Sequence, residues 1–177
     1  MRESIGASWM IGIVAMFVAL FSGFLAYAIS YTRAFNTKNE IVNLIEHNDG
    51  FSTFSGPSGD VKNASDKELV DDGSVEALAY RAIKNLGYNY SLFEDGLKGD
   101  ANCLIRTDEV DLKGKMMNGY CLVKRCENGD KNKNTTYKVT AFVALKIPVI
   151  EIIVKIPVSG ETRTISYDVG NFECSNY

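Results

Sequence analysis

The stretch GFLAYAISYTRAFNTKNEIVNLIE, residues 23–46, joins an apolar segment to an amphipathic one without an interruption. Its first third is uncharged and rich in large apolar side chains. Its last third mixes apolar and polar residues at the spacing of a helix. Residues 24–49 contain neither glycine nor proline, the two residues that disfavour a helix most strongly. The sequence therefore predicts one helix that leaves a membrane and continues into solvent.

The segment before this stretch is long enough to cross a bilayer. Residues 4–32 contain no charged side chain, and a hydrocarbon core of about 30 Å needs about 20 apolar residues in a helix. A cleaved signal peptide is the alternative, but its apolar region is usually about 7–15 residues long. We therefore expect an uncleaved anchor and assign residues 1–32 to a transmembrane helix and residues 33–48 to its extracytoplasmic continuation.

The continuation carries one apolar stripe. Tyr27, Tyr31, Ala34, Ile41 and Ile45 recur at helical spacing. Lys38 falls within the stripe, where its methylene stem can pack while its ammonium group reaches water. A continuous helix over residues 4–47 would be about 66 Å long. The alternative is two helices with a bend near residues 30–31, which we do not favour because no proline, Gly/Ser pair or bulge signal is present there.

Residues 49–100 are predicted to form a connection and a small helical subdomain. Ser65 and Glu68 have the spacing of a capping box. A second helix is predicted over residues 75–86, with Ser74 as its N-cap and Gly87 at its C-terminal cap. Six of its residues form one apolar face: Val75, Leu78, Ala79, Ala82, Ile83 and Leu86.

The remaining residues, 101–177, are predicted to form an antiparallel sheet. From residue 119 onwards the sequence has four runs rich in β-branched and aromatic residues, separated by NGDKNKN (128–134), by Pro148 and by Ser159-Gly160. One face of this sheet needs a cover, and the amphipathic helices provide it. We therefore predict an α+β fold in which a long N-terminal helix packs on a sheet of about four strands.

The four cysteines, Cys103, Cys121, Cys126 and Cys174, all lie in the predicted sheet region. Their spacing lacks the C-x-x-C pattern of a zinc site, so disulfides are the better prediction. Cys121 and Cys126 lie about 16 Å apart if both belong to one strand, too far for a bond between them. Two pairings remain: 103–121 with 126–174, or 103–126 with 121–174.

The cysteines also predict the orientation of the chain. Positive charge is nearly balanced on the two sides of the apolar run, with Arg2 on one side and Arg33 and Lys38 on the other. Disulfides form in oxidising compartments. We therefore expect a single-pass membrane protein with a cytoplasmic N-terminus and an extracytoplasmic C-terminal domain.

The sequence gives no sign of catalysis, a cofactor or a small-molecule substrate. His47 is the only histidine, and the sequence contains no phosphate loop, nucleophile elbow or zinc-protease motif. Asp130, Asn132 and Asn134 resemble the start of a calcium loop, but Thr135 and Ala141 stand where glycine and glutamate are needed. The net charge of −3 argues against a nucleic-acid partner. We predict that the protein is not an enzyme and that it has no metal site and no cofactor.

The stalk-like segment ESIGASWMIGIVAMFVALFSGFLAYAISYTRAFNTKNEIVNLIE (residues 3–46) and the C-terminal segment FVALKIPVIEIIVKIPVSGETRTI (residues 142–165) together resemble type IV pilins and pseudopilins. The second segment is similar to the sheet region of the small TadE-like proteins of tight-adherence systems. This resemblance implies a pilin-like fold, a lipid bilayer as one partner, and other pilin-like subunits or assembly machinery as further partners.

The resemblance also implies a processing site and a packing face. Gly6 is the candidate processing site, although its leader is only five residues long and Ile11 stands where pilins usually carry a glutamate. This departure favours a minor or uncleaved component. The residues expected to pack between helices are Gly12, Gly23, Ala34, Ile41 and Ile45. The alternative function is a single-span binding or sensing domain that does not polymerise, with a pocket lined by aromatic residues from residues 87–93.

Overall fold

The computed structural model describes residues 2–88, 102–106, 111–117, 119–127, 133–147 and 152–174. Its longest element is α1 (Arg2–His47), a single helix of 46 residues with no break at residues 30–31. The helix ends where Asp49 and Gly50 adopt positive φ angles of 48° and 143°. The N–H of Gly50 donates to the carbonyl of Ile45 there. The prediction of one continuous helix is confirmed.

Two short helices follow the turn. Helix α2 (Asp66–Asp72) begins with the predicted capping box, in which the Ser65 and Glu68 side chains each bind the other's backbone N–H. Helix α3 (Val75–Asn85) has Ser74 as its N-cap. Gly87 follows α3 with a φ of 62°, as expected for a left-handed C-terminal cap.

Among the described residues the sheet has six strands, compared with the expected number of about four. Its strands are β1 (Asn102–Arg106), β2 (Asp111–Met116), β3 (Tyr120–Cys126), β4 (Lys133–Ile147), β5 (Ile152–Glu161) and β6 (Ile165–Tyr167). They follow the order β1-β2-β3-β4-β5, with β6 pairing to β4, and each pairing is antiparallel.

All the described strands lie within the predicted bounds of the sheet, residues 101–177, but two details of the strands differ from the prediction. The strands β1 and β2 precede the region in which four strands were expected. Ser159 and Gly160 were expected to end a strand, but both lie within β5 and pair with Thr140 and Val139 of β4. Gly160 is tolerated inside this strand because it packs against the stem of Lys38: a Cβ at Gly160 would lie 2.7 Å from Lys38 Cδ.

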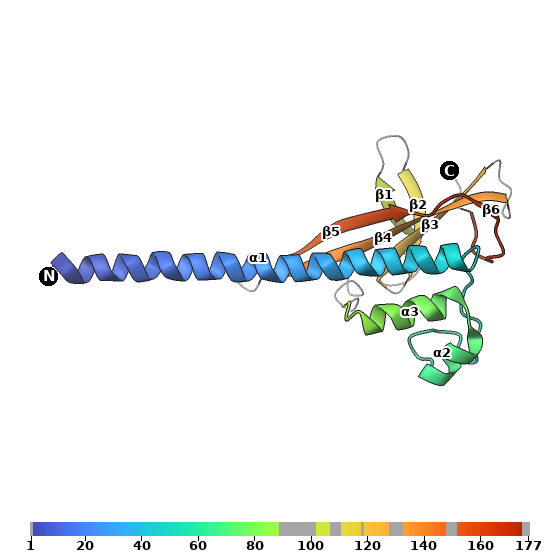
Figure 1. Cartoon of the computed structure of the whole chain (residues 1–177), viewed down its shortest axis with the longest axis horizontal. Coiled ribbons are helices and arrows are strands. Elements are labelled where there is room, and N and C mark those ends of the chain that lie inside the picture. The colour runs from blue at the N-terminus through green and yellow to red at the C-terminus, as the bar shows by residue number, and fades with distance from the viewer. Residues whose placement is uncertain are drawn as a thin grey trace.

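The outer half of α1 lies between the sheet and α3 (Figure 1). The N-terminal half extends beyond both layers as an isolated rod (Figure 1). In β4 the alternate residues Tyr137, Val139, Ala141 and Val143 are fully or almost fully buried in the main core. A second, smaller cluster joins α2, α3 and the preceding turn through Phe54, Val61, Leu69, Ala77 and Tyr80.

Candidate functional site

The N-terminal half of α1 is an exposed apolar surface. Every residue from 9 to 26 is exposed, and Trp9 retains 74% of its accessible surface. The helix is long and apolar enough to cross a membrane: its best window has a mean hydropathy of 2.2, and none of that window is buried by the rest of the chain. A lone apolar rod of this kind needs lipid or other helices around it.

Gly12 and Gly23 lie on this rod with open space around them. A Cβ added at either glycine would meet no atom of the chain within 4 Å. Since the two residues are 11 positions apart, about three helical turns, they lie on nearly the same side of α1. Gly6 belongs to the same helix, and nothing in the fold tests its processing.

Ala34, Ile41 and Ile45 belong to the other half of α1 and are completely buried in the main core. There they meet residues of the sheet and of α3, so their packing partners lie within the same chain. Of the five residues expected to pack between helices, Gly12 and Gly23 are therefore the two that face outwards.

Aromatic rings line the boundary between the two halves. Tyr27, Tyr31 and Phe35 form a ladder on α1, with ring centroids 6.1 Å and 6.4 Å apart. Lys38 Nζ lies 4.5 Å from the centroid of the Phe35 ring. The Lys38 side chain is half-buried. Its position matches the expectation that its stem packs while its ammonium group stays near water.

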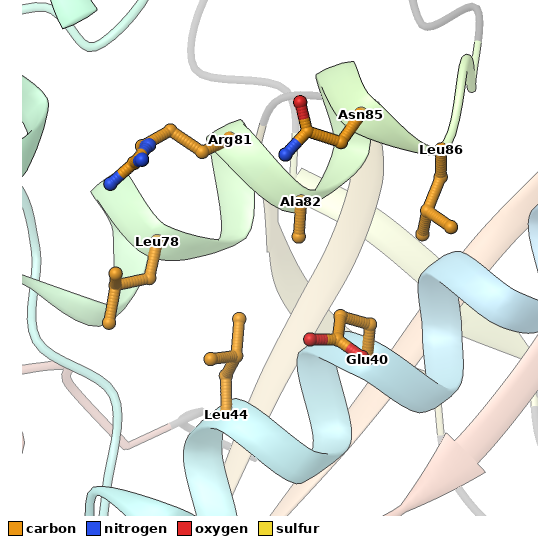
Figure 2. Close-up of a pocket in the computed structure, with 7 residues that line it drawn as sticks. All are labelled: Glu40, Leu44, Leu78, Arg81, Ala82, Asn85 and Leu86. Carbon is orange, nitrogen blue, oxygen red and sulfur yellow. The ribbon is translucent and has the colours of Figure 1, made fainter.

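A groove separates α1 from α3 (Figure 2). It has a volume of about 440 Å³ and is lined by both apolar and polar side chains. The residues that line it are Glu40, Leu44, Leu78, Arg81, Ala82, Asn85 and Leu86. No aromatic side chain is among them, and residues 89–93, part of the expected aromatic pocket, lie outside the described residues.

A buried ion pair at the far end of the sheet was not predicted. Lys124 Nζ lies 3.0 Å from Asp168 Oδ2, and both side chains are completely buried. Lys124 also donates to the carbonyl of Phe172 at 3.0 Å. The hydroxyls of Thr135 and Tyr137 donate to Asp168 Oδ2 at 2.7 Å and 2.6 Å. This set of contacts satisfies both buried charges.

The same network reaches the end of α1. The Tyr137 hydroxyl accepts the N–H of Phe51 at 3.3 Å, and Asp168 Oδ1 accepts the N–H of Gly170 at 2.7 Å. Burial, followed by the hydrogen bond to the Asp168 carboxylate, raises the pKa of Tyr137 far above its usual range. Tyr137 therefore stays neutral and acts as a fixed donor that joins β4, the C-terminal segment and the turn after α1.

One signal in the sequence pointed to this network. Lys124 shares its strand parity with Tyr120 and Leu122, both buried, so a lysine stands at a position that belongs to an apolar face. Its counter-charge, Asp168, lies 44 positions later. The pattern of residues within one strand cannot predict that Lys124 and Asp168 form an ion pair.

The cysteines form the first of the two expected pairings as far as the structure describes them. Cys126 and Cys174 are bonded, with a Cα–Cα distance of 5.8 Å. This bond excludes the pairing of Cys103 with Cys126. Cys121 is also disulfide-bonded, and the side chain of Cys103 lies outside the described residues.

The candidate metal ligands can be placed only in the described part of the chain. Among these residues, no group of three or more His, Cys, Asp or Glu side chains could hold a metal ion. Asp130 and Asn132 of the calcium-like loop are outside the described residues, and Asn134 belongs to β4. His47 is an exposed residue at the end of α1.

The geometry thus defines an α+β protein with one N-terminal helix suited to a membrane and a domain built around the other half of that helix. Comparison with protein-family models, with curated proteins and with solved structures gives no match.

Proposed function

We propose that the protein is a membrane-anchored, pilin-like structural or assembly subunit of a bacterial surface appendage or of a secretion apparatus of the tight-adherence type. One observation carries this proposal: a single unbroken helix has its N-terminal half exposed and apolar and its C-terminal half buried in its own domain. Such a helix can be held in lipid before assembly and packed against neighbouring helices afterwards, because both surroundings cover apolar side chains.

The proposed location follows from the same features. The anchor is a single span, with the N-terminus in the cytoplasm and the sheet domain outside it. The Cys126–Cys174 disulfide supports this orientation because such bonds persist in oxidising compartments. The proposed partners are the bilayer and other pilin-like subunits or their assembly machinery.

The exposed glycines give the proposal a specific contact between subunits. Small residues let two helices approach closely in a membrane, and Gly12 and Gly23 meet no other part of their own chain. Replacing both with leucine should block close approach between copies. The replacement should leave the sheet domain unchanged, since neither residue contacts it.

The experiment combines fractionation with these variants. Sheared surface material and membranes are isolated from cells, the mature N-terminus is determined by mass spectrometry, and neighbouring copies are trapped by chemical crosslinking. We expect crosslinked multimers and co-purifying subunits for the unmodified protein, and their loss in the Gly12→Leu/Gly23→Leu variant. Ser22→Leu is the matched control, because it adds a similar side chain about 100° around the helix from Gly23.

A second candidate function is a single-span extracytoplasmic binding or sensing domain that does not polymerise. The groove between α1 and α3 favours it, since its volume of about 440 Å³ is within the range typical of ligand sites. The same experiment separates the two functions. A monomer that keeps Met1, stays in the membrane and brings no other subunit with it would contradict the pilin-like function and support the binding domain.

A further inference from the structure

We infer that the membrane-facing end of the β4–β5 pair is a second membrane contact, which rests in the lipid headgroup layer beside the transmembrane helix. This inference depends on the proposed membrane anchoring but not on polymerisation. The contact consists of the end of β4 (residues 144–147) and the start of β5 (residues 152–155).

The aromatic residues of α1 mark where the bilayer should end. Trp9 is followed by Tyr27 after 18 positions and by Tyr31 after 22, which correspond to about 27 Å and about 33 Å along a helix. These distances bracket the hydrocarbon thickness of about 30 Å. Trp and Tyr concentrate at membrane interfaces. The outer interface therefore lies at Tyr27 and Tyr31, just before Arg33, the first charged residue after the apolar run.

The sheet reaches this level. Strand β5 runs in the same direction as α1, and its first residues lie nearer the N-terminal end of the helix (Figure 1). The contact of Gly160 with Lys38 fixes the two elements relative to each other. Ile152 precedes Gly160 by eight residues, about 26 Å along a strand, or about 19 Å along α1 if the strand is inclined by about 45°.

Tyr27 precedes Lys38 by eleven residues, about 17 Å along α1. Ile152 therefore lies at about the level of Tyr27. Two side chains agree with this alignment, because Tyr27 and Ile156 are both half-buried against the main core. The sheet thus covers α1 as far as the aromatic boundary, and its strand ends lie at that boundary.

The composition of the strand ends suits the headgroup layer. The paired residues at the end of the ladder are apolar, with Ile147 opposite Ile152 and Leu145 opposite Val154. The charged residues in these two segments are Lys146 and Lys155, both basic. Basic residues at a strand end favour an anionic lipid surface.

The sheet topology limits the depth of the contact. Strand β5 is at the edge of the main strand order, and within the described part of the chain no strand pairs with its other side. Unpaired backbone groups are too costly in hydrocarbon but are hydrated among headgroups. The contact is therefore interfacial and does not cross the membrane.

Tryptophan fluorescence tests this contact directly, because Trp9 is the only tryptophan of the chain. The full-length protein is reconstituted in vesicles that contain anionic lipids with brominated acyl chains, which quench nearby tryptophans. Ile152→Trp and Ile153→Trp are each made in a Trp9→Phe background. Both positions are used because consecutive strand residues face opposite sides of a sheet. Tyr167→Trp in the same background is the control, at a residue of β6 that is 68% exposed.

We expect at least one of the two β5 tryptophans to lose half or more of its emission, and the tryptophan at position 167 to lose almost none. Circular dichroism confirms that the variants keep the fold. The inference is overturned if both β5 tryptophans are quenched no more than the control while Trp9 of the unmodified chain is strongly quenched. That result would leave the membrane anchor intact. Absence of quenching at Trp9 would instead overturn the anchor, and this inference with it.

Discussion

The two halves of α1 have the same backbone but opposite surroundings. From residue 9 to residue 26 every side chain is exposed, including the large apolar ones. From Ala34 to Ile45 the apolar stripe is completely buried by the sheet and by α3. The comparison shows that helix continuity and helix burial are specified separately. Because helix-breaking residues are absent, α1 continues as one helix. Its burial depends on the folded domain, which covers only the second half.

Among the substitutions considered, loss of the buried ion pair should lower the stability of the domain around the outer half of α1 the most. Lys124→Met leaves the Asp168 carboxylate buried without its counter-charge, so we expect the free energy of unfolding to fall by about 3–5 kcal/mol. Urea unfolding of the full chain in detergent micelles measures the change. Lys84→Met is the matched control, because Lys84 pairs with Asp66 at 3.3 Å on the surface and its loss should cost at most about 1 kcal/mol. Equal effects of the two variants would contradict the role assigned to the buried pair.

The same substitution, isoleucine to alanine, made once in each half of α1 tests the difference between the two halves. Ile41→Ala removes a side chain from the main core and should lower the free energy of unfolding by about 2–4 kcal/mol. Ile29→Ala removes the same atoms from an exposed position of α1 and should change it by less than about 0.5 kcal/mol. The same urea titration in micelles measures both variants. A large loss of domain stability from Ile29→Ala would show that the inner half also depends on the domain.

The smallest expected effect concerns Glu76, the first-turn acid of α3. Burial raises its pKa above the ordinary value of 4.5, even though the carboxylate accepts the N–H of Phe54. The folded state therefore keeps this proton to a higher pH than the unfolded state does. Its contribution to stability is complete below pH 4.5 and is lost as the pH rises through the folded pKa. Glu76→Gln should remove this part of the pH dependence.

Glu68 provides a control of opposite sign. The backbone N–H of Ser65 lowers the pKa of Glu68 below 4.5, so its contribution is present above that pH and is lost on acidification. Melting temperatures measured from about pH 2.5 to about pH 7 should show that Glu76→Gln, above pH 4.5, and Glu68→Gln, below it, change the slope in opposite directions. Slopes that change in the same direction would contradict the assignment for Glu76.

The sequence was informative where structure depends on local pattern. The long helix and the capping box at Ser65 both arise from neighbours within a few residues, and each was predicted correctly. The predicted strand end at Ser159 and Gly160 was wrong: both residue types are common in turns, but here they lie inside β5. The reason lies in Lys38, more than 100 positions earlier, whose stem occupies the space beside Gly160. The pairing of Lys124 with Asp168 was missed for the same reason, since contacts between distant segments leave little trace in a local pattern.

The absence of a hinge in α1 has a mechanical consequence. From Tyr31 to His47 the helix runs for about 24 Å beyond the expected membrane boundary. A tilt of about 10° in the membrane would move its far end by about 4 Å. A rotation of the rod about its own axis would swing the whole sheet domain by the same angle. The orientation of the sheet domain relative to the membrane is therefore set by the tilt and rotation of the transmembrane part of α1.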